Sequence, residues 1–89
     1  MTVASELQLR VWVEDVWDTV EISAIPDWTF KLVKEEALNR ATNGTADPKM
    51  YGVKFRGALV LDETRSLADL NVPDRAALIV LATRRRPVR

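Results

Sequence analysis

Residues 65–81 read RSLADLNVPDRAALIVL and carry the clearest structural signals in this chain of 89 residues. Leu67 and Leu70 are three positions apart, so one turn of helix puts both side chains on one face. The polar and proline residues at 71–74 are typical of a tight turn. Residues 76–81 form an apolar run with the length of a strand. The stretch therefore predicts a helical turn, a tight turn and a final strand, in that order.

The beginning of the chain predicts a β-hairpin. Apolar and polar residues alternate over residues 7–13 and again over residues 19–22, which is the period of a half-buried strand. A polar turn that starts at Glu14 separates them. Pro26 then ends the second strand, because proline has no N–H group to donate within a sheet.

An amphipathic helix is expected next. Its buried face is predicted from the apolar residues that recur at helical spacing, namely Phe30, Val33, Ala37, Leu38 and Ala41. Its solvent face is predicted from the charged residues Lys31, Lys34, Glu35 and Glu36. Asp27 or Thr29 can cap the first free N–H groups, and Gly44 can adopt the left-handed conformation that ends a helix.

Two more strands are expected at residues 51–55 and 58–61, on either side of a turn at Arg56 and Gly57. The predicted order is then β-β-α-β-β-β, with a short helical turn before the last strand. A mixed sheet packed on one helix buries the apolar face of every element in this order. The expected fold class is therefore α+β.

This order, together with residues 65–81, resembles the ubiquitin-like β-grasp family. The positions in that stretch with the residue types of ubiquitin are Arg65, Leu67, Asp69, Asn71 and Leu78. The resemblance covers residues 7–83 and implies a β-grasp sheet. The frequent arginine, valine and alanine are similar to small bacterial β-grasp proteins, including those encoded with type VII secretion systems.

The C-terminal sequence differs from that of ubiquitin-type modifiers, which present a Gly-Gly whose carboxylate an activating enzyme adenylates. No glycine follows Gly57, and the last residues are Arg84-Arg85-Arg86-Pro87-Val88-Arg89. We therefore expect a protein that is not conjugated. Two alternatives remain: a divergent modifier activated at a terminus without Gly-Gly, and an accessory component of a secretion system.

A protein-interaction surface is expected on the sheet face opposite the helix. Period 2 sends Trp12, Ile79 and Leu81 to that face, with Arg10 and Lys54 at its edge. By the resemblance, Lys54 stands where ubiquitin has the central isoleucine of its recognition patch. An exposed apolar patch with aromatic and basic members marks an interaction site. The other interpretation is a solvated face of strand-favouring residues.

Two further tryptophans have different expected places. Trp28 stands at the start of the helix, where it is expected to pack the helix against the sheet. Trp17 stands in the hairpin turn, and turns lie on the surface. It can either extend the interaction patch or cover the end of the core.

Composition excludes several kinds of chemistry. The chain has neither cysteine nor histidine, which excludes disulfides, thiol catalysis, Cys/His zinc sites and acid–base catalysis by histidine. The carboxylates are scattered over turns and the helix surface, so we expect no enzyme, no cofactor and no metal. The first ten residues lack the features of a secretory signal, and no apolar run has the roughly 20 residues of a membrane span. A cytoplasmic protein is expected.

The charge is unevenly distributed. Residues 1–82 contain nine basic and 13 acidic residues, whereas residues 84–89 contain four arginines and no acid. We expect a flexible segment at 1–6, one domain at 7–83 and a basic tail at 84–89. The tail arginines are Arg84, Arg85, Arg86 and Arg89. A solubilising tail is favoured over a nucleic-acid or anionic-membrane contact, because no aromatic residue interleaves the arginines, and docking to an acidic partner is the intermediate option. The expected partner is a protein.

Overall fold

Five strands form one mixed sheet, and one α-helix covers one of its faces in the computed structural model, which describes residues 6–82. The strands and the helix are β1 (Leu7–Val13), β2 (Asp18–Ala24), α1 (Phe30–Thr42), β3 (Tyr51–Phe55), β4 (Ala58–Leu59) and β5 (Ala77–Ala82). Three short 3₁₀ turns are η1 (Glu14–Val16), η2 (Pro48–Met50) and η3 (Ala68–Leu70). The predicted α+β class is confirmed.

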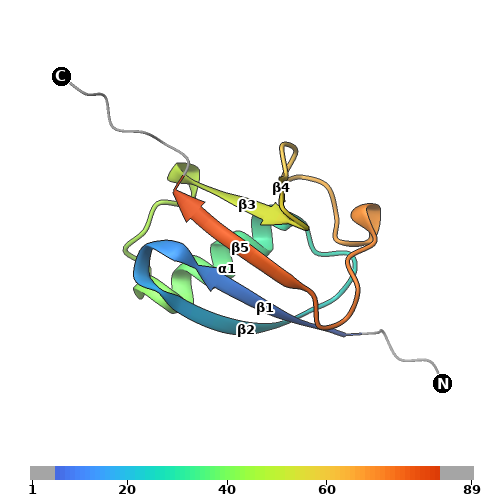
Figure 1. The fold of residues 1–89 in the computed structure, drawn as a ribbon, viewed down its shortest axis with the longest axis horizontal. Coiled ribbons are helices and arrows are strands. Elements are labelled where there is room, and N and C mark those ends of the chain that lie inside the picture. Colours follow the sequence, from blue (N-terminus) through green and yellow to red (C-terminus); the bar gives the residue numbers. More distant parts are fainter. Residues whose placement is uncertain (1–5, 83–89) are drawn as a thin grey trace.

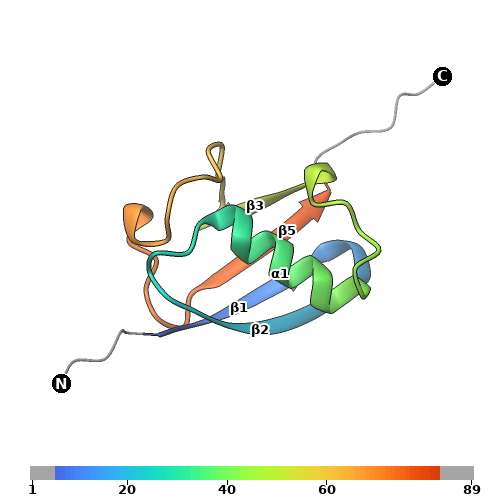
Figure 2. The same cartoon turned by 180° about the vertical axis from the view of Figure 1, so that it is seen from behind.

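The strand order in the sheet is β2-β1-β5-β3-β4. The first and last strands, β1 and β5, lie side by side and run parallel, while the other neighbours are antiparallel. Figure 1 shows the sheet in front of α1, and Figure 2 shows α1 in front of the sheet. One face of the sheet therefore packs on α1, and the opposite face, called here the outer face, carries no described helix.

The helix begins and ends where capping chemistry permits. The Thr29 hydroxyl accepts a hydrogen bond from the Leu32 N–H at 3.1 Å, so Thr29 and not Asp27 is the N-cap. Asn43 and Gly44 both have positive φ, at 56° and 80°, and this left-handed geometry ends α1. The core residues predicted for its buried face are buried, except Ala41, which is partly buried.

The prediction that Lys34 lies on the solvent face is wrong. Lys34 is only 5% exposed, and its ammonium donates to the backbone carbonyl of Tyr51 at 2.9 Å and to Glu63 at 2.5 Å. A lysine stem can lie along apolar surface while its charged end finds polar partners. The ion pair connects α1 to the loop after β4.

The C-terminal half follows the predicted order with shifted boundaries. Arg56 and Gly57 have φ of 56° and 82°, as a two-residue hairpin turn with two left-handed positions requires. Strand β4 is shorter than the predicted 58–61, because Val60 turns into the core while Leu61 is 88% exposed. Strand β5 begins one residue later than predicted.

The core lies between the sheet and α1. Its largest fully buried side chains are Phe30, Leu9, Ile22, Leu38, Leu67 and Leu78. Trp28 packs against this core and is half-buried, as expected, and its carbonyl accepts from the Leu67 N–H at 2.8 Å. This contact holds the segment around η3 against the start of α1. The inner face of the sheet is thus packed against the core, and the outer face is the side left open by the described helix.

Candidate functional site on the outer sheet face

The register of the sheet brings predicted patch residues together in one row. Trp12 on β1 is the partner of Ile79 on β5, and Ile79 is the partner of Lys54 on β3. The row ends at Thr19 on β2 and Leu59 on β4. The neighbours of Trp12 along β1 are fully buried on the helix side, so alternation places Trp12 on the outer face.

Leu81 lies on the same outer face, two residues beyond Ile79 on β5. Its partner on β3 is Gly52, which has no side chain to cover it. Leu81 and Ile79 are both half-buried, as residues on an open sheet face are. The prediction that Trp12, Ile79 and Leu81 share one face is therefore confirmed by the register.

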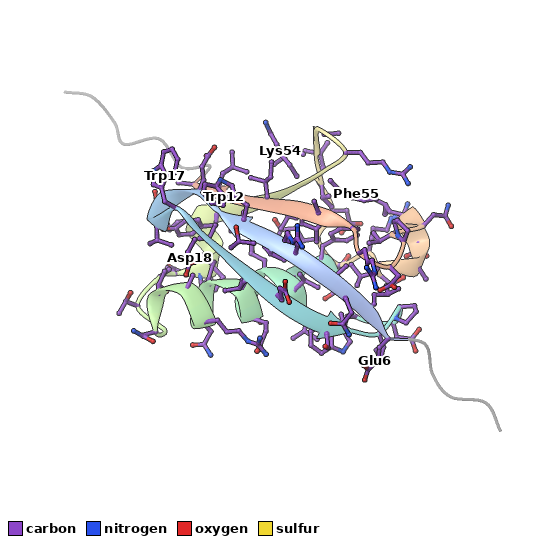
Figure 3. All side chains as sticks on the ribbon, turned by 60° about the horizontal axis from the view of Figure 1, so that its bottom comes forward. Glu6, Trp12, Trp17, Asp18, Lys54 and Phe55 are labelled. Carbon is purple, nitrogen blue, oxygen red and sulfur yellow. The ribbon has the colours of Figure 1, made fainter. Side chains whose placement is uncertain are left out.

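Trp17 joins this patch from the hairpin turn. The Trp12 and Trp17 rings meet edge to face, with centroids 5.5 Å apart and planes at 88°, and Figure 3 shows them close together where β1 ends. Trp17 is 79% exposed, so it extends the patch and does not cover the core. Its φ of 54° is left-handed, an uncommon conformation for a large aromatic residue.

Lys54 is the charged member of the row. Its direct cross-strand neighbours are the apolar residues Ile79 and Leu59, and Figure 3 shows the lysine standing on the side of the sheet away from α1. Within residues 6–82 its ammonium takes part in none of the ion pairs and side-chain hydrogen bonds. Lys54 is half-buried, so an unpaired charge stands among apolar side chains.

Some of the other charged residues near the patch are paired or stacked, whereas the exposed Glu14 and Asp18, close to Trp17 in the hairpin, form no ion pair among the described residues. Arg10 and Glu21 are cross-strand partners with a separation of 4.0 Å between Nη2 and Oε2. The Arg56 guanidinium lies over the Phe55 ring, 5.0 Å from its centroid. Arg10, Glu21 and Arg56 are exposed, whereas Phe55 is buried in the core. Among residues 6–82, the outer face therefore has an apolar centre with the unpaired ammonium of Lys54 beside it, and charged residues around it.

Comparison with known proteins agrees on the fold. Ubiquitin of Caldiarchaeum subterraneum superposes with a TM-score of 0.75 at 15% identity, over 94% of this chain and 98% of that one. The chain has the ubiquitin-like β-grasp fold. A designed protein based on ubiquitin is similar at a TM-score of 0.74 and 17% identity, over 94% and 96% of the two chains.

A plant protein domain is similar to this β-grasp chain to the same degree. The ubiquitin-like domain of an Arabidopsis thaliana protein has a TM-score of 0.76 at 10% identity, over 100% of this chain and 89% of that domain. No protein-family model and no curated protein sequence matches the chain. The similarity thus establishes the fold, and the site has to be argued from its own geometry.

Leu59 is a member of the β-grasp patch that was not predicted from the sequence, and for Trp17 the sequence left open whether it extends the patch or covers the end of the core. Leu59 is the partner of Lys54 because the two-residue turn at Arg56 and Gly57 pairs Phe55 with Ala58 and then the next residues outward. That register could have been read from the turn itself. The contact of Trp17 with Trp12 depends on the left-handed turn, for which the sequence has no Asn-Gly signal.

Two groups outside the patch, the Tyr51 phenol and the Asp62 carboxylate, have shifted pKa values. The Tyr51 hydroxyl donates to Asp15 at 2.7 Å, and this hydrogen bond, with burial and the negative charge, raises the pKa of Tyr51. Hydrogen bonds from the Thr64 hydroxyl and N–H lower the pKa of Asp62. Within residues 6–82 no group of acidic side chains is arranged to hold a metal ion.

The predicted basic tail lies outside the described residues. This applies to Arg84, Arg85, Arg86 and Arg89, and to residues 1–5 of the flexible segment predicted at residues 1–6. No helix within residues 6–82 has the length and apolar character needed to cross a bilayer. The candidate site is accordingly the outer face of the sheet, defined by Trp12, Trp17, Lys54, Leu59, Ile79 and Leu81.

Proposed function

We propose that this chain is a non-catalytic, non-conjugated ubiquitin-like module that binds a partner protein through its outer sheet face. The observation that carries the proposal is the row from Trp12 through Ile79 to Lys54, which crosses three neighbouring strands. Trp17 packs on the Trp12 end of this row, and Leu81 lies two residues beyond Ile79 on the same face. Exposed apolar surface of this kind, with aromatic anchors and a polar border, is typical of protein interfaces.

The position of Trp17 favours an interface over a merely solvated strand face. Strand-favouring residues explain single apolar side chains on a sheet, but Trp17 belongs to a turn and has no strand to favour. Tryptophan is among the residues that contribute most to binding energy at interfaces. A 79% exposed tryptophan packed on a second tryptophan therefore supports binding.

The non-catalytic and non-conjugated parts of the proposal rest on the sequence. The chain contains no cysteine or histidine, and residues 58–89 contain no glycine. The proposal retains the cytoplasmic location and the bacterial origin expected from the sequence.

Affinity purification of the tagged chain from its own cells tests the proposal. It is run in parallel under native and fully denaturing conditions, and both samples are analysed by mass spectrometry. We expect partners only in the native sample. Adducts that survive denaturation show covalent attachment and support the modifier instead.

Matched variants then locate the binding surface. Replacing Ile79 and Leu81 with aspartate is expected to abolish recovery of the partner while the circular dichroism spectrum stays native. Leu32→Asp is the control, because Leu32 is an exposed leucine on α1, on the other side of the molecule. If the Ile79/Leu81 variant recovers the partner as well as the parent chain does, the outer face is not the binding surface.

A further inference from the structure

The unpaired ammonium of Lys54 restricts the kind of partner that fits the outer face. This lysine stands between Ile79 and Leu59, and within residues 6–82 it has no counterion. A half-buried charge next to apolar side chains loses hydration when a partner covers it, and that loss is unfavourable unless the partner supplies an opposite charge. An apolar partner alone therefore fits the patch poorly.

The tryptophan end of the patch, formed by Trp12 and Trp17, fits an apolar contact and not a charged one. Trp12 and Trp17 meet edge to face at 5.5 Å and leave most of Trp17 exposed. Trp17 is also held in a left-handed backbone conformation, which an aromatic residue adopts at an energetic cost. Trp12 is partly buried, whereas most of the Trp17 ring is open to solvent among the described residues, and an apolar side chain that packs on such a ring removes its apolar surface from water.

The sheet sets the spacing between Lys54 and Trp12, the residue on which Trp17 packs. Trp12 and Lys54 stand on strands separated only by β5, so their backbones are about 10 Å apart, which is two strand spacings. Side chains two turns apart on a helix, or about three residues apart on an extended strand, span such a distance. One short segment can therefore reach both ends of the row.

We propose that the partner presents an acidic, apolar segment, with a carboxylate placed on Lys54 and an apolar side chain placed against Trp17. The inference rests on the proposed binding function and specifies the chemistry of its partner. Lys54 selects for the carboxylate, because a glutamine or lysine at that place leaves the ammonium unpaired or repelled. The tryptophan pair supplies the apolar contact.

Binding of three matched peptides to the full chain tests the inference. The first is an amphipathic helical peptide with a leucine stripe bordered by glutamates, and the other two carry glutamines or lysines in place of those glutamates. Affinity is measured by calorimetry, and contact is located from the indole N–H signals of Trp12 and Trp17 in NMR spectra. The acidic peptide is expected to bind about tenfold more tightly than the glutamine peptide. Its affinity should fall as salt is added.

Charge reversal provides the matched variants. Lys54→Glu is expected to invert the order, so that the lysine peptide binds more tightly than the acidic one. Lys31→Glu makes the same change of charge at an exposed position of α1, and it should leave the order unchanged. Equal affinity for the acidic and glutamine peptides overturns the inference. A change in the order of peptide affinities that is the same in Lys54→Glu and Lys31→Glu also overturns it.

Failure of the inference is distinguishable from failure of the proposed function. If the native partner is lost with the Ile79/Leu81 variant but retained with Lys54→Glu, the outer face is the binding surface and the partner is not acidic. If neither variant changes recovery of the partner, the proposed function itself is wrong. If both variants lose the partner, the result supports the proposed function and the acidic partner.

Discussion

Trp12 and Ile79 are direct partners on β1 and β5, the parallel pair at the centre of the sheet. These two strands lie at opposite ends of the sequence, so this single pairing joins the beginning of the chain to its last strand. Because both side chains face away from α1, the pairing creates an apolar centre on the outer face. Trp17 and Lys54 extend it in opposite directions.

Removing Trp17 should weaken binding far more than it weakens the fold. Trp17 is 79% exposed, so Trp17→Ala is expected to change the free energy of unfolding by less than about 0.5 kcal/mol. The same change is expected to lower partner affinity by more than about tenfold, as for an anchor residue. Urea unfolding and calorimetric binding measure the two effects.

Trp17→Gly distinguishes the effect of losing the side chain from the effect of the left-handed backbone conformation. Glycine adopts the left-handed conformation of this position without the cost that tryptophan carries, so the variant should be at least as stable as the Ala variant. Trp28→Ala is the contrasting control. Trp28 packs on the core, and its truncation is expected to cost about 2 kcal/mol. If Trp17→Gly retains full partner affinity, Trp17 is not an anchor.

Lys34 and Glu63 form an ion pair, and we expect a large coupling free energy between them in the stability of the fold. Lys34→Met leaves the half-buried Glu63 without its partner, and the expected loss is about 2 kcal/mol of unfolding free energy. The double variant Lys34→Met/Glu63→Met replaces both charges with apolar groups, and it should recover most of that loss. A double-mutant cycle in urea measures the coupling. If the changes in unfolding free energy of the two single variants add up to that of the double variant, the two residues are not coupled.

The pKa of Tyr51 predicts a loss of stability in alkaline solution. Its pKa is raised above the ordinary value of 10.0, chiefly by the hydrogen bond it donates to Asp15, so the folded state favours the neutral phenol. The resulting stabilisation is complete below the ordinary pKa and disappears as the pH rises through the raised pKa. The free energy of unfolding should therefore fall more steeply above pH 10 in the parent chain than in Tyr51→Phe.

Tyr51 is the only tyrosine in the chain, so ultraviolet absorbance reports its ionisation directly. Asp15→Asn removes the charge and weakens the principal interaction, so the absorbance midpoint should move down towards the ordinary value. A midpoint that is the same in the native chain, in Asp15→Asn and in urea contradicts the raised pKa.

The sequence was sufficient for the parts of the fold that depend on local pattern. Alternation predicted strand β1, and capping chemistry predicted the end of α1 at Asn43 and Gly44 and gave Thr29 as one of two candidate N-caps. Period 2, with the resemblance that placed the first and last strands together, predicted that Trp12 and Ile79 share a face. Each of these features depends on a few neighbouring residues or on a topology already recognised.

The parts that were missed depend on contacts between distant segments. Lys34 has the spacing of a solvent-facing residue, and its burial follows from the Tyr51 carbonyl and Glu63, neither of which is near it in sequence. The orientation of Trp17 follows from a left-handed turn without a characteristic sequence. In both cases tertiary packing decided between conformations that the local sequence permits.

Arg40 protects the exposed edge of the sheet, and its removal should promote self-association. β2 is an edge strand, and edge strands present unpaired backbone groups to other chains. The Arg40 guanidinium reaches from α1 to the Glu21 carbonyl at 2.9 Å and is held by Glu36 at 2.9 Å. Arg40→Ala is therefore expected to show a mass that rises with protein concentration in light scattering.

Arg65→Ala is the matched control for this edge. Arg65 also forms an i, i+4 ion pair, with Asp69, and its side chain is 56% exposed, compared with 50% for Arg40. Its guanidinium donates to no β2 carbonyl among the described residues, so its loss should leave the mass unchanged. If the two variants associate equally, general loss of surface charge explains the effect. Association by Arg40→Ala alone assigns the protection of β2 to the bond between Arg40 and Glu21.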